Sequence, residues 1–211
     1  MLEKEKINQV LTILEKTYPD ASTALHYDTP FELLVATILS AQCTDKRVNI
    51  ITKKLFQKYN KPEDFASLSA EELSVWIKSC GFYRNKSQNI IAASKMILEQ
   101  FDGMVPNSRE ELMKLPGVGR KTANVVISNA YGQEAIAVDT HVFRVSNRIG
   151  LAKATNVKET EFQLMRNIPK GKWINAHHWL IHHGRNICKA RTPLCHECPI
   201  RELCQYFQRQ N

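Results

Sequence analysis

Residues 115–123 read LPGVGRKTA and connect two segments whose apolar residues recur at helical spacing. Pro116 ends the first helix, and the two glycines allow a tight turn with positive φ before the second helix begins. Because a glycine leaves no side chain in the way, the amides of this turn and of the helix N-terminus can approach a phosphate group closely. A plain glycine turn between two helices is the alternative. The residues expected to contact a phosphate are Gly117, Val118, Gly119 and Arg120.

Outside this stretch, apolar residues recur at helical spacing along almost the whole chain. Residues 31–39 are apolar on most sides, which predicts a central buried helix. Ser69 with Glu72, and Ser108 with Glu111, have the spacing of capping boxes and predict two helix starts. No segment shows sustained period-two alternation, so we predict an all-α fold built from short helices.

Four cysteines fall within 17 residues at the spacing C-x6-C-x2-C-x5-C. Soft thiolate ligands select iron–sulfur clusters or zinc, and this spacing favours a [4Fe–4S] cluster as the cofactor. A structural zinc site is the main alternative, although such sites commonly use two close cysteine pairs. Disulfides are a weaker alternative, because the charged start at residues 1–6 shows no secretory signal. The proposed ligands are Cys188, Cys195, Cys198 and Cys204, while Cys43 and Cys80 are interpreted as core thiols.

Composition places the chain among ordinary globular proteins and points to a polyanionic partner. Its 211 residues are 43% hydrophobic and 24% charged, with a formal net charge of +8. Residues 1–110 carry 14 Lys/Arg and 14 Asp/Glu, whereas residues 111–211 carry 15 and 7, so the second half holds the entire excess. The longest apolar stretch, around residues 31–41, is interrupted by polar side chains and too short for a bilayer span. We expect no membrane partner and a cytoplasmic location.

Three motifs occur in a fixed order along the chain. LPGVGRKTANVV begins at Leu115, AVDTHVFR occupies residues 137–144, and the cysteine set follows. Together they resemble the endonuclease III family, the iron–sulfur branch of the helix–hairpin–helix DNA glycosylases, from about Pro30 to Cys204. The resemblance implies a bifunctional DNA glycosylase/AP lyase of base excision repair. Its partner would be double-stranded DNA carrying an oxidised or saturated pyrimidine, such as thymine glycol, or an abasic site.

The resemblance also implies a two-domain helical architecture. Residues 22–132 would form a helical barrel domain that holds the helix–hairpin–helix. Residues 1–21 would form an N-terminal helix packed on an iron–sulfur cluster domain of residues 133–211. DNA would lie across the groove between the domains. We expect a monomer associated with the nucleoid.

Lys121 and Asp139 are the candidate catalytic pair. From spacing alone, Lys121 is a surface phosphate contact and Asp139 is the N-cap of the next helix. By resemblance, Lys121 matches the nucleophile that forms a Schiff base with the sugar, and Asp139 matches the catalytic carboxylate. A lysine must be unprotonated to attack, and both the helix N-terminus and Arg120 would lower its pKa.

Two further residues match family positions that enter the DNA stack. Gln42, within the string SAQCTD, corresponds to the residue that fills the space left by an extruded nucleotide. Phe82 corresponds to an apolar wedge between bases, although many relatives carry an aliphatic residue there. The alternatives are a glutamine that caps the buried helix and a phenylalanine in the core.

Cations near the cysteine set are candidates for phosphate contact. Lys189 and Arg191 lie between the first two cysteines, where the cluster would stiffen their loop; a solvated loop is the alternative. Arg144 is a vaguer candidate, equally suited to a salt bridge. The histidines at 177, 178, 182 and 183 lack an HExxH pattern, and we interpret them as packing and hydrogen-bonding residues.

Two other functions were considered. An adenine-specific mismatch glycosylase shares the hairpin and the cysteine spacing, but it typically lacks a lysine at position 121 and has an additional C-terminal domain. Here Lys121 is present and seven residues follow Cys204. A non-catalytic iron–sulfur module that clamps DNA is the alternative of a different class.

Overall fold

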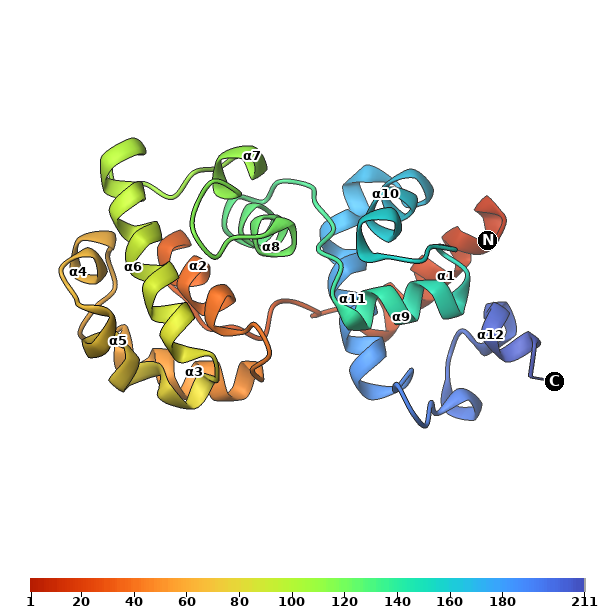
Figure 1. The fold of residues 1–211 in the computed structure, drawn as a ribbon. Helices are drawn as coiled ribbons and strands as arrows, with labels where there is room; N and C mark the ends of the chain where they lie inside the picture. The colour runs from red at the N-terminus through yellow and green to blue at the C-terminus, as the bar shows by residue number, and fades with distance from the viewer. Residues whose placement is uncertain (211) are drawn as a thin grey trace. The chain divides into compact units, whose positions relative to one another are not determined.

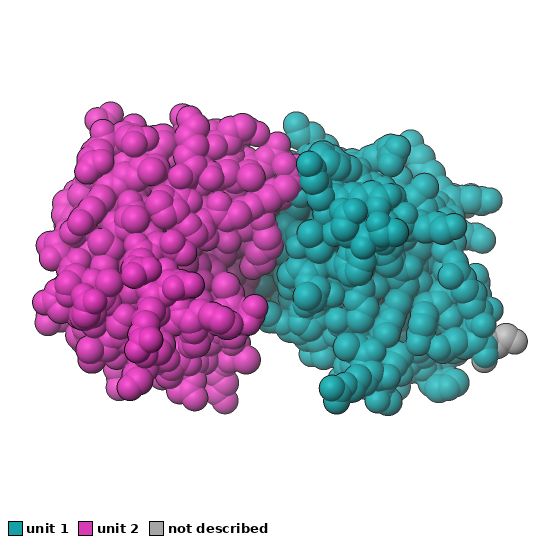
Figure 2. Space-filling model, in the orientation of Figure 1, with its two compact units in different colours: residues 1–22, 133–211 teal, residues 23–132 magenta. Residues whose placement is uncertain are grey.

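The computed structural model describes residues 1–210, which form α-helices and short 3-10 helices without a strand (Figure 1). The all-α prediction is confirmed. Two compact units are distinguished by colour in Figure 2: unit 1 comprises residues 1–22 and 133–211, and unit 2 comprises residues 23–132. Within the described chain, no helix is both long enough and apolar enough to cross a lipid bilayer.

Unit 2 is organised around a buried central helix, as the sequence predicts. Every residue from Phe31 to Leu39 is buried, including Glu32 and Thr37. Thr29 caps this helix by accepting a hydrogen bond from the Glu32 amide at 3.2 Å. The helices of unit 2 are α2 (Pro30–Leu39), α3 (Asp45–Leu55), α4 (Pro62–Ala66), α5 (Ala70–Ile77), η1 (Lys78–Cys80), α6 (Tyr83–Gln100), α7 (Arg109–Leu112) and α8 (Arg120–Tyr131).

One of the two expected capping boxes is complete and the other is modified. At the start of α5, Glu72 N donates to Ser69 Oγ at 3.2 Å and Ser69 N donates to Glu72 Oε2 at 2.7 Å. At the start of α7, Glu111 N donates to Ser108 Oγ, but the Glu111 carboxylate accepts from the Ser108 hydroxyl at 2.8 Å. The second box is therefore a correction, because the carboxylate bonds the capping hydroxyl instead of the Ser108 amide.

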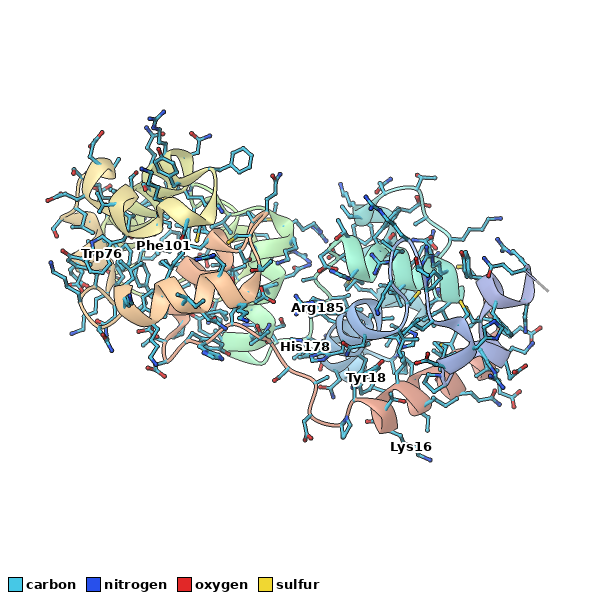
Figure 3. The ribbon with its side chains drawn as sticks, turned by 90° about the horizontal axis from the view of Figure 1, so that it is seen from below. Lys16, Tyr18, Trp76, Phe101, His178 and Arg185 are labelled. Atoms are coloured by element: carbon cyan, nitrogen blue, oxygen red, sulfur yellow. The ribbon has the colours of Figure 1, made fainter. Side chains whose placement is uncertain are left out.

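Unit 1 brings the N-terminal helix onto the C-terminal third of the chain. One face of α1 is buried against α11, in a hydrophobic core that also includes residues of α9. Tyr18, directly after α1, lies beside α11, which carries the labelled His178 and Arg185 (Figure 3). The helices of unit 1 are α1 (Lys4–Thr17), α9 (Thr140–Ile149), α10 (Val157–Asn167), η2 (Lys170–Lys172), α11 (Trp173–Asn186), η3 (Cys195–Glu197), η4 (Arg201–Leu203) and α12 (Gln205–Gln208).

Candidate active site

The two glycines of the hairpin differ in backbone conformation and in surroundings. Gly117 has φ +78°, and a Cβ there would lie 2.8 Å from Asn89 Cβ on α6, so only glycine fits. Gly119 has φ −90° as the N-cap of α8, and a Cβ there would meet nothing within 4 Å. The expectation of positive φ is confirmed for Gly117 and wrong for Gly119, because an N-cap residue is extended. Gly119 instead leaves an open surface at the helix N-terminus.

The hairpin places its basic side chains at the start of α8. Arg120 and Lys121 are the first two residues of this helix, and Lys121 is exposed. The Val118 side chain is buried and its amide donates to Leu115 O at 3.1 Å, so this amide is already used inside the hairpin. The first turn of any α-helix directs backbone amides without acceptors inside the helix toward its N-terminus. The N-terminus of α8 therefore favours an anion, and it disfavours positive charge on the two basic side chains located there, Arg120 and Lys121.

Asp139 caps α9, and the N-cap prediction is confirmed. Its Oδ1 accepts a hydrogen bond from Val142 N at 2.8 Å. The residues that precede it, 135–138, are buried, and the His177 ring contacts the Ala137 carbonyl at 2.7 Å between Nδ1 and O. A side chain from α11 thus fixes the segment that carries the carboxylate, a role that the sequence did not reveal.

The structure excludes the alternatives considered for Gln42 and Phe82. Phe82 is 64% exposed, so it is not a core residue. Gln42 is exposed and does not cap α2; Ser40 does, with its amide bonded to Ala36 O and its hydroxyl to Thr37 O. Both residues have left-handed backbones, with φ of 53° for Gln42 and 46° for Phe82.

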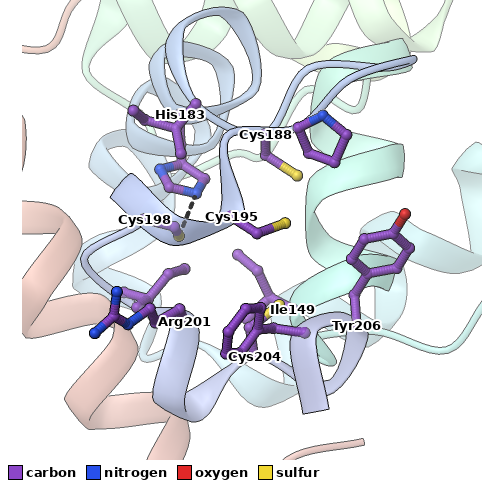
Figure 4. A pocket seen from close by; sticks show the side chains of 12 residues that line it. Ile149, His183, Cys188, Cys195, Cys198, Arg201, Cys204 and Tyr206 are labelled. Carbon is purple, nitrogen blue, oxygen red and sulfur yellow. Dashed lines mark hydrogen bonds between the residues drawn. The ribbon is translucent and has the colours of Figure 1, made fainter. Parts of the chain in front are cut away.

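The four cysteines of the C-terminal set line one pocket in unit 1 (Figure 4). Burial raises the pKa of the Cys198 thiol to about 11 and also raises that of Cys204; the other thiols of the set, when charged, act in the same direction. A metal must therefore displace protons from these thiols when it binds. Four soft, partly buried sulfur donors around one space fit an iron–sulfur cluster. Among residues 1–210, no group of three or more His, Cys, Asp or Glu side chains is placed to bind a single metal ion.

Side chains outside the set donate to two of the sulfurs or lie next to them. Arg148 Nη1 lies 3.6 Å from Cys188 Sγ, and His183 Nε2 lies 3.5 Å from Cys198 Sγ. The other ring nitrogen of His183 contacts the Tyr18 hydroxyl at 3.1 Å. Burial lowers the pKa of His183 to about 4 and, together with the Cys198 and Cys188 charges, raises the pKa of Tyr18 to about 12. The ring and the phenol are therefore neutral near pH 7, and they support the cysteine set without adding charge.

Two arginines on one face of α9 hold the loop that begins at Cys188. Arg148 donates to Lys189 O at 2.7 Å and to Ala190 O at 2.8 Å. Arg144 donates to Cys188 O at 3.0 Å and to Gly184 O at 2.9 Å. The Arg144 guanidinium is thus engaged within unit 1, which favours a structural role over the DNA contact considered from sequence.

Lys189 and Arg191 differ from these arginines, since both side chains are exposed. Arg148 donates a hydrogen bond to Lys189 O and so holds the backbone of this loop in place. The loop therefore exposes two cationic side chains from a fixed backbone. The α11 histidines are packing and hydrogen-bonding residues, as expected: His177 and His183 are buried, and the His182 ring contacts Ser22 O at 3.4 Å. Burial, with a smaller effect from His182, lowers the pKa of His178 to about 4.

Comparison with protein families defines the class of this protein. Residues 35–170 match the HhH-GPD superfamily of base excision DNA repair proteins, and residues 188–204 match the iron–sulfur binding domain of endonuclease III. The fold and the site are therefore those of a base excision DNA repair protein with an iron–sulfur cofactor.

Individual relatives narrow this class to one family. The endonuclease III of Bacillus subtilis (strain 168) is 52% identical over 212 residues, covering 100% of this chain and 97% of its own length. That of Escherichia coli (strain K12) is 45% identical over 208 residues, covering 99% of each chain. A solved trapped endonuclease III–DNA covalent intermediate has a TM-score of 0.95 and 50% identity, covering 100% of this chain and 99% of that one.

The chain belongs to the endonuclease III family. It is a DNA glycosylase with AP lyase activity that acts in base excision repair and uses a [4Fe–4S] cluster.

Proposed function

We propose that Lys121 is the nucleophile of this glycosylase/AP lyase and that its substrates are oxidised or saturated pyrimidines in duplex DNA. The observation that supports this most directly is an exposed lysine in the first turn of α8, next to the open surface at Gly119. A solved relative that is 50% identical is a trapped covalent intermediate with DNA, which favours covalent chemistry here.

The reaction requires a neutral amine and an extruded nucleoside. Lys121 Nζ bonds to the sugar C1′ while the C1′–N bond to the base breaks, and the departing base takes up a proton. Opening of the sugar ring leaves a protonated imine on C1′. The imine withdraws electrons, a proton leaves C2′, and β-elimination expels the 3′ phosphate. Water then hydrolyses the imine and releases Lys121.

Asp139 would act on the same sugar as a fixed carboxylate. Its hydrogen bond to Val142 N holds one oxygen at the N-terminus of α9, where negative charge is favoured. A carboxylate held in this way stabilises positive charge that develops on the sugar and can assist proton transfer.

Gln42 and Phe82 would separate the damaged nucleotide from the stack. Gln42 fills the space that the nucleotide leaves, and Phe82 enters between neighbouring bases. The exposure and left-handed backbone of both residues support this proposal.

The cysteines at 188, 195, 198 and 204 would hold the cluster, which stiffens the surrounding loop when bound. Lys189 and Arg191 would then contact phosphates, together with the backbone at Gly117, Gly119 and Arg120, whereas the Val118 amide is already bonded to Leu115 O. Arg144 would support the loop through its hydrogen bonds to Gly184 O and Cys188 O. We propose that the enzyme acts as a monomer in the cytoplasm on DNA of the nucleoid.

Borohydride reduction tests the role of Lys121. The native protein mixed with abasic duplex DNA and borohydride is expected to give a covalent adduct, because reduction fixes the imine. Lys121→Ala should give none, whereas Lys114→Ala, which alters another exposed lysine of unit 2, should trap as the native protein does. An adduct with Lys121→Ala at the native yield would overturn the assignment.

A further inference from the structure

Lys86 is a buried cation in unit 2 whose amine connects two segments of the chain. Residues 39–43, at and after the end of α2, are called the Gln42 loop, and residues 80–82, at and after the end of η1, are called the Phe82 loop. Its side chain belongs to α6 and is only 5% exposed. Nζ donates to Leu39 O at 2.8 Å, to Ala41 O at 2.8 Å and to Cys80 O at 2.9 Å. A protonated lysine has three N–H donors, so these carbonyls use all of them.

The three carbonyls lie within three residues of the two side chains proposed to enter DNA. Ala41 immediately precedes Gln42, and Cys80 is two residues before Phe82. In unit 2, the non-glycine residues with positive φ are Gln42 at 53°, Phe82 at 46° and Asp102 at 50°. A left-handed backbone is unfavourable for residues other than glycine and persists where surrounding contacts hold it.

The acceptors of the Lys86 amine are backbone carbonyls, which carry no formal charge. Burial lowers the pKa of the Lys86 amine, while the nearby Cys80 and Cys43 thiols oppose that shift. Each of these thiols belongs to one of the two loops, so the loops approach each other around the amine. A buried ammonium without acceptors would be costly, and the carbonyls provide its solvation. The amine and the two loops therefore stabilise one another.

We propose that Lys86 is a positioning residue that holds the Gln42 and Phe82 loops at a fixed separation. The Gln42 and Phe82 side chains then enter the duplex together. The proposal rests on the roles given above to Gln42 and Phe82. Lys86 itself touches neither DNA nor the reacting sugar. Its contribution is to order both loops before DNA binds, which spares the enzyme this ordering cost during base extrusion.

The expected consequence is specific to extrusion. Lys86→Met retains most of the length of the side chain and removes every donor. Because misplacement of about 1 Å can cost roughly 10²-fold in rate, excision of thymine glycol from intact duplex should fall by about 10²-fold. Cleavage of a preformed abasic site should fall by about tenfold or less, since such a site has no base to unstack.

The experiment measures extrusion directly. A duplex carries thymine glycol and, in the opposite strand, 2-aminopurine, whose fluorescence rises when it unstacks. The native protein and Lys95→Met, which alters an exposed lysine of the same helix, should give the same rise. Lys86→Met should give a slower or smaller rise, and Lys86→Arg, which retains a charge and donors, should recover part of it. If Lys86→Met does not fold, Lys86→Gln serves in its place.

A combination of variants distinguishes a failure of the role given to Lys86 from a failure of the roles given to Gln42 and Phe82. If Gln42→Ala and Phe82→Ala both excise at the native rate, the roles proposed for these loops are wrong and the inference fails with them. If those variants are impaired while Lys86→Met extrudes and excises normally, only the inference about Lys86 is overturned. In a Gln42→Ala/Phe82→Ala background, adding Lys86→Met should cost little more; a full further loss of about 10²-fold would show that Lys86 acts elsewhere.

Discussion

The hairpin of unit 2 and the cysteine loop of unit 1 are both candidate DNA-contacting segments, yet they are held by different means. The hairpin depends on its own backbone: a positive φ at Gly117, a helix N-cap at Gly119 and a hydrogen bond from the Val118 amide to the Leu115 carbonyl. Residues 188–204, by contrast, contain only two short 3-10 helices, Cys195–Glu197 and Arg201–Leu203.

Distant side chains support the cysteine loop instead. Arg144 and Arg148 reach it from α9, and His183 reaches Cys198 from α11 with Tyr18 behind it. The segment before Asp139 is held in the same manner, by His177. The position of the proposed nucleophile, Lys121, thus depends mainly on local conformation. The positions of Asp139 and of the exposed cations of unit 1 depend on contacts between distant parts of the chain.

Asp139 should be separable into a carboxylate role and a capping role. Asparagine caps helices about as well as aspartate, so Asp139→Asn should leave the free energy of unfolding unchanged within about 0.5 kcal/mol. Excision should fall by about 10²–10⁴-fold, because the charge is lost. Asp139→Ala should lose the same activity and, in addition, about 1 kcal/mol of stability. Single-turnover excision measures the activity, and urea unfolding measures the stability. Native activity in Asp139→Asn would show that Asp139 acts only as a helix cap.

The two glycines of the hairpin offer a matched pair. Gly117→Ser forces a left-handed serine and a 2.8 Å approach to Asn89 Cβ, and should cost roughly 2–4 kcal/mol in the free energy of unfolding. Gly119→Ser enters open space at an N-cap, where serine is favoured, and should fold normally. Its affinity for DNA should nevertheless fall, because the side chain obstructs the phosphate. Equal stability of the two variants would contradict the assigned difference.

Unit 1 should lose stability in acid through His178. Its pKa is about 4 in the folded protein, mainly because of burial, against an ordinary value of 6.5. Between these values the unfolded chain binds the extra proton, so stability is full above pH 6.5 and falls as the pH drops toward 4. The part of the loss that is due to His178 should be on the order of 2 kcal/mol from pH 7 to pH 5. Buried His183, whose pKa is also lowered to about 4, adds a similar part that a change at His178 leaves in place. His178→Gln should remove this part of the pH dependence, whereas the exposed His26→Gln should retain it; unchanged slopes in both would count against the assignment.

The exposed cations of the cysteine loop should give the smallest effect. Lys189→Ala/Arg191→Ala should lower affinity for duplex DNA about tenfold and reduce the slope of log K against log salt by about 1.8, for two phosphate contacts. Lys158→Ala, at an exposed position of α10, should leave the slope unchanged. An unaltered slope in the double variant would indicate that the loop is merely solvated.

The same contrast explains what the sequence could and could not predict. The turn at Gly117, the caps at Ser69 and Asp139 and the buried helix α2 follow from residue types at short spacing, and these expectations are confirmed. The roles of Lys86, Arg144 and Arg148 were missed because most of their acceptors are backbone carbonyls 40 or more residues away. Every residue has a carbonyl, so no residue type marks such an acceptor in the sequence.

The most direct test of the account is to locate the bond between protein and sugar. Native protein is reduced with borohydride on abasic duplex DNA, the DNA and the protein are digested, and mass spectrometry identifies the peptide that carries the deoxyribose remnant. We expect a single modified peptide with the added mass on Lys121. The remnant on another amine, such as Lys189 or the amino group of Met1, would contradict it.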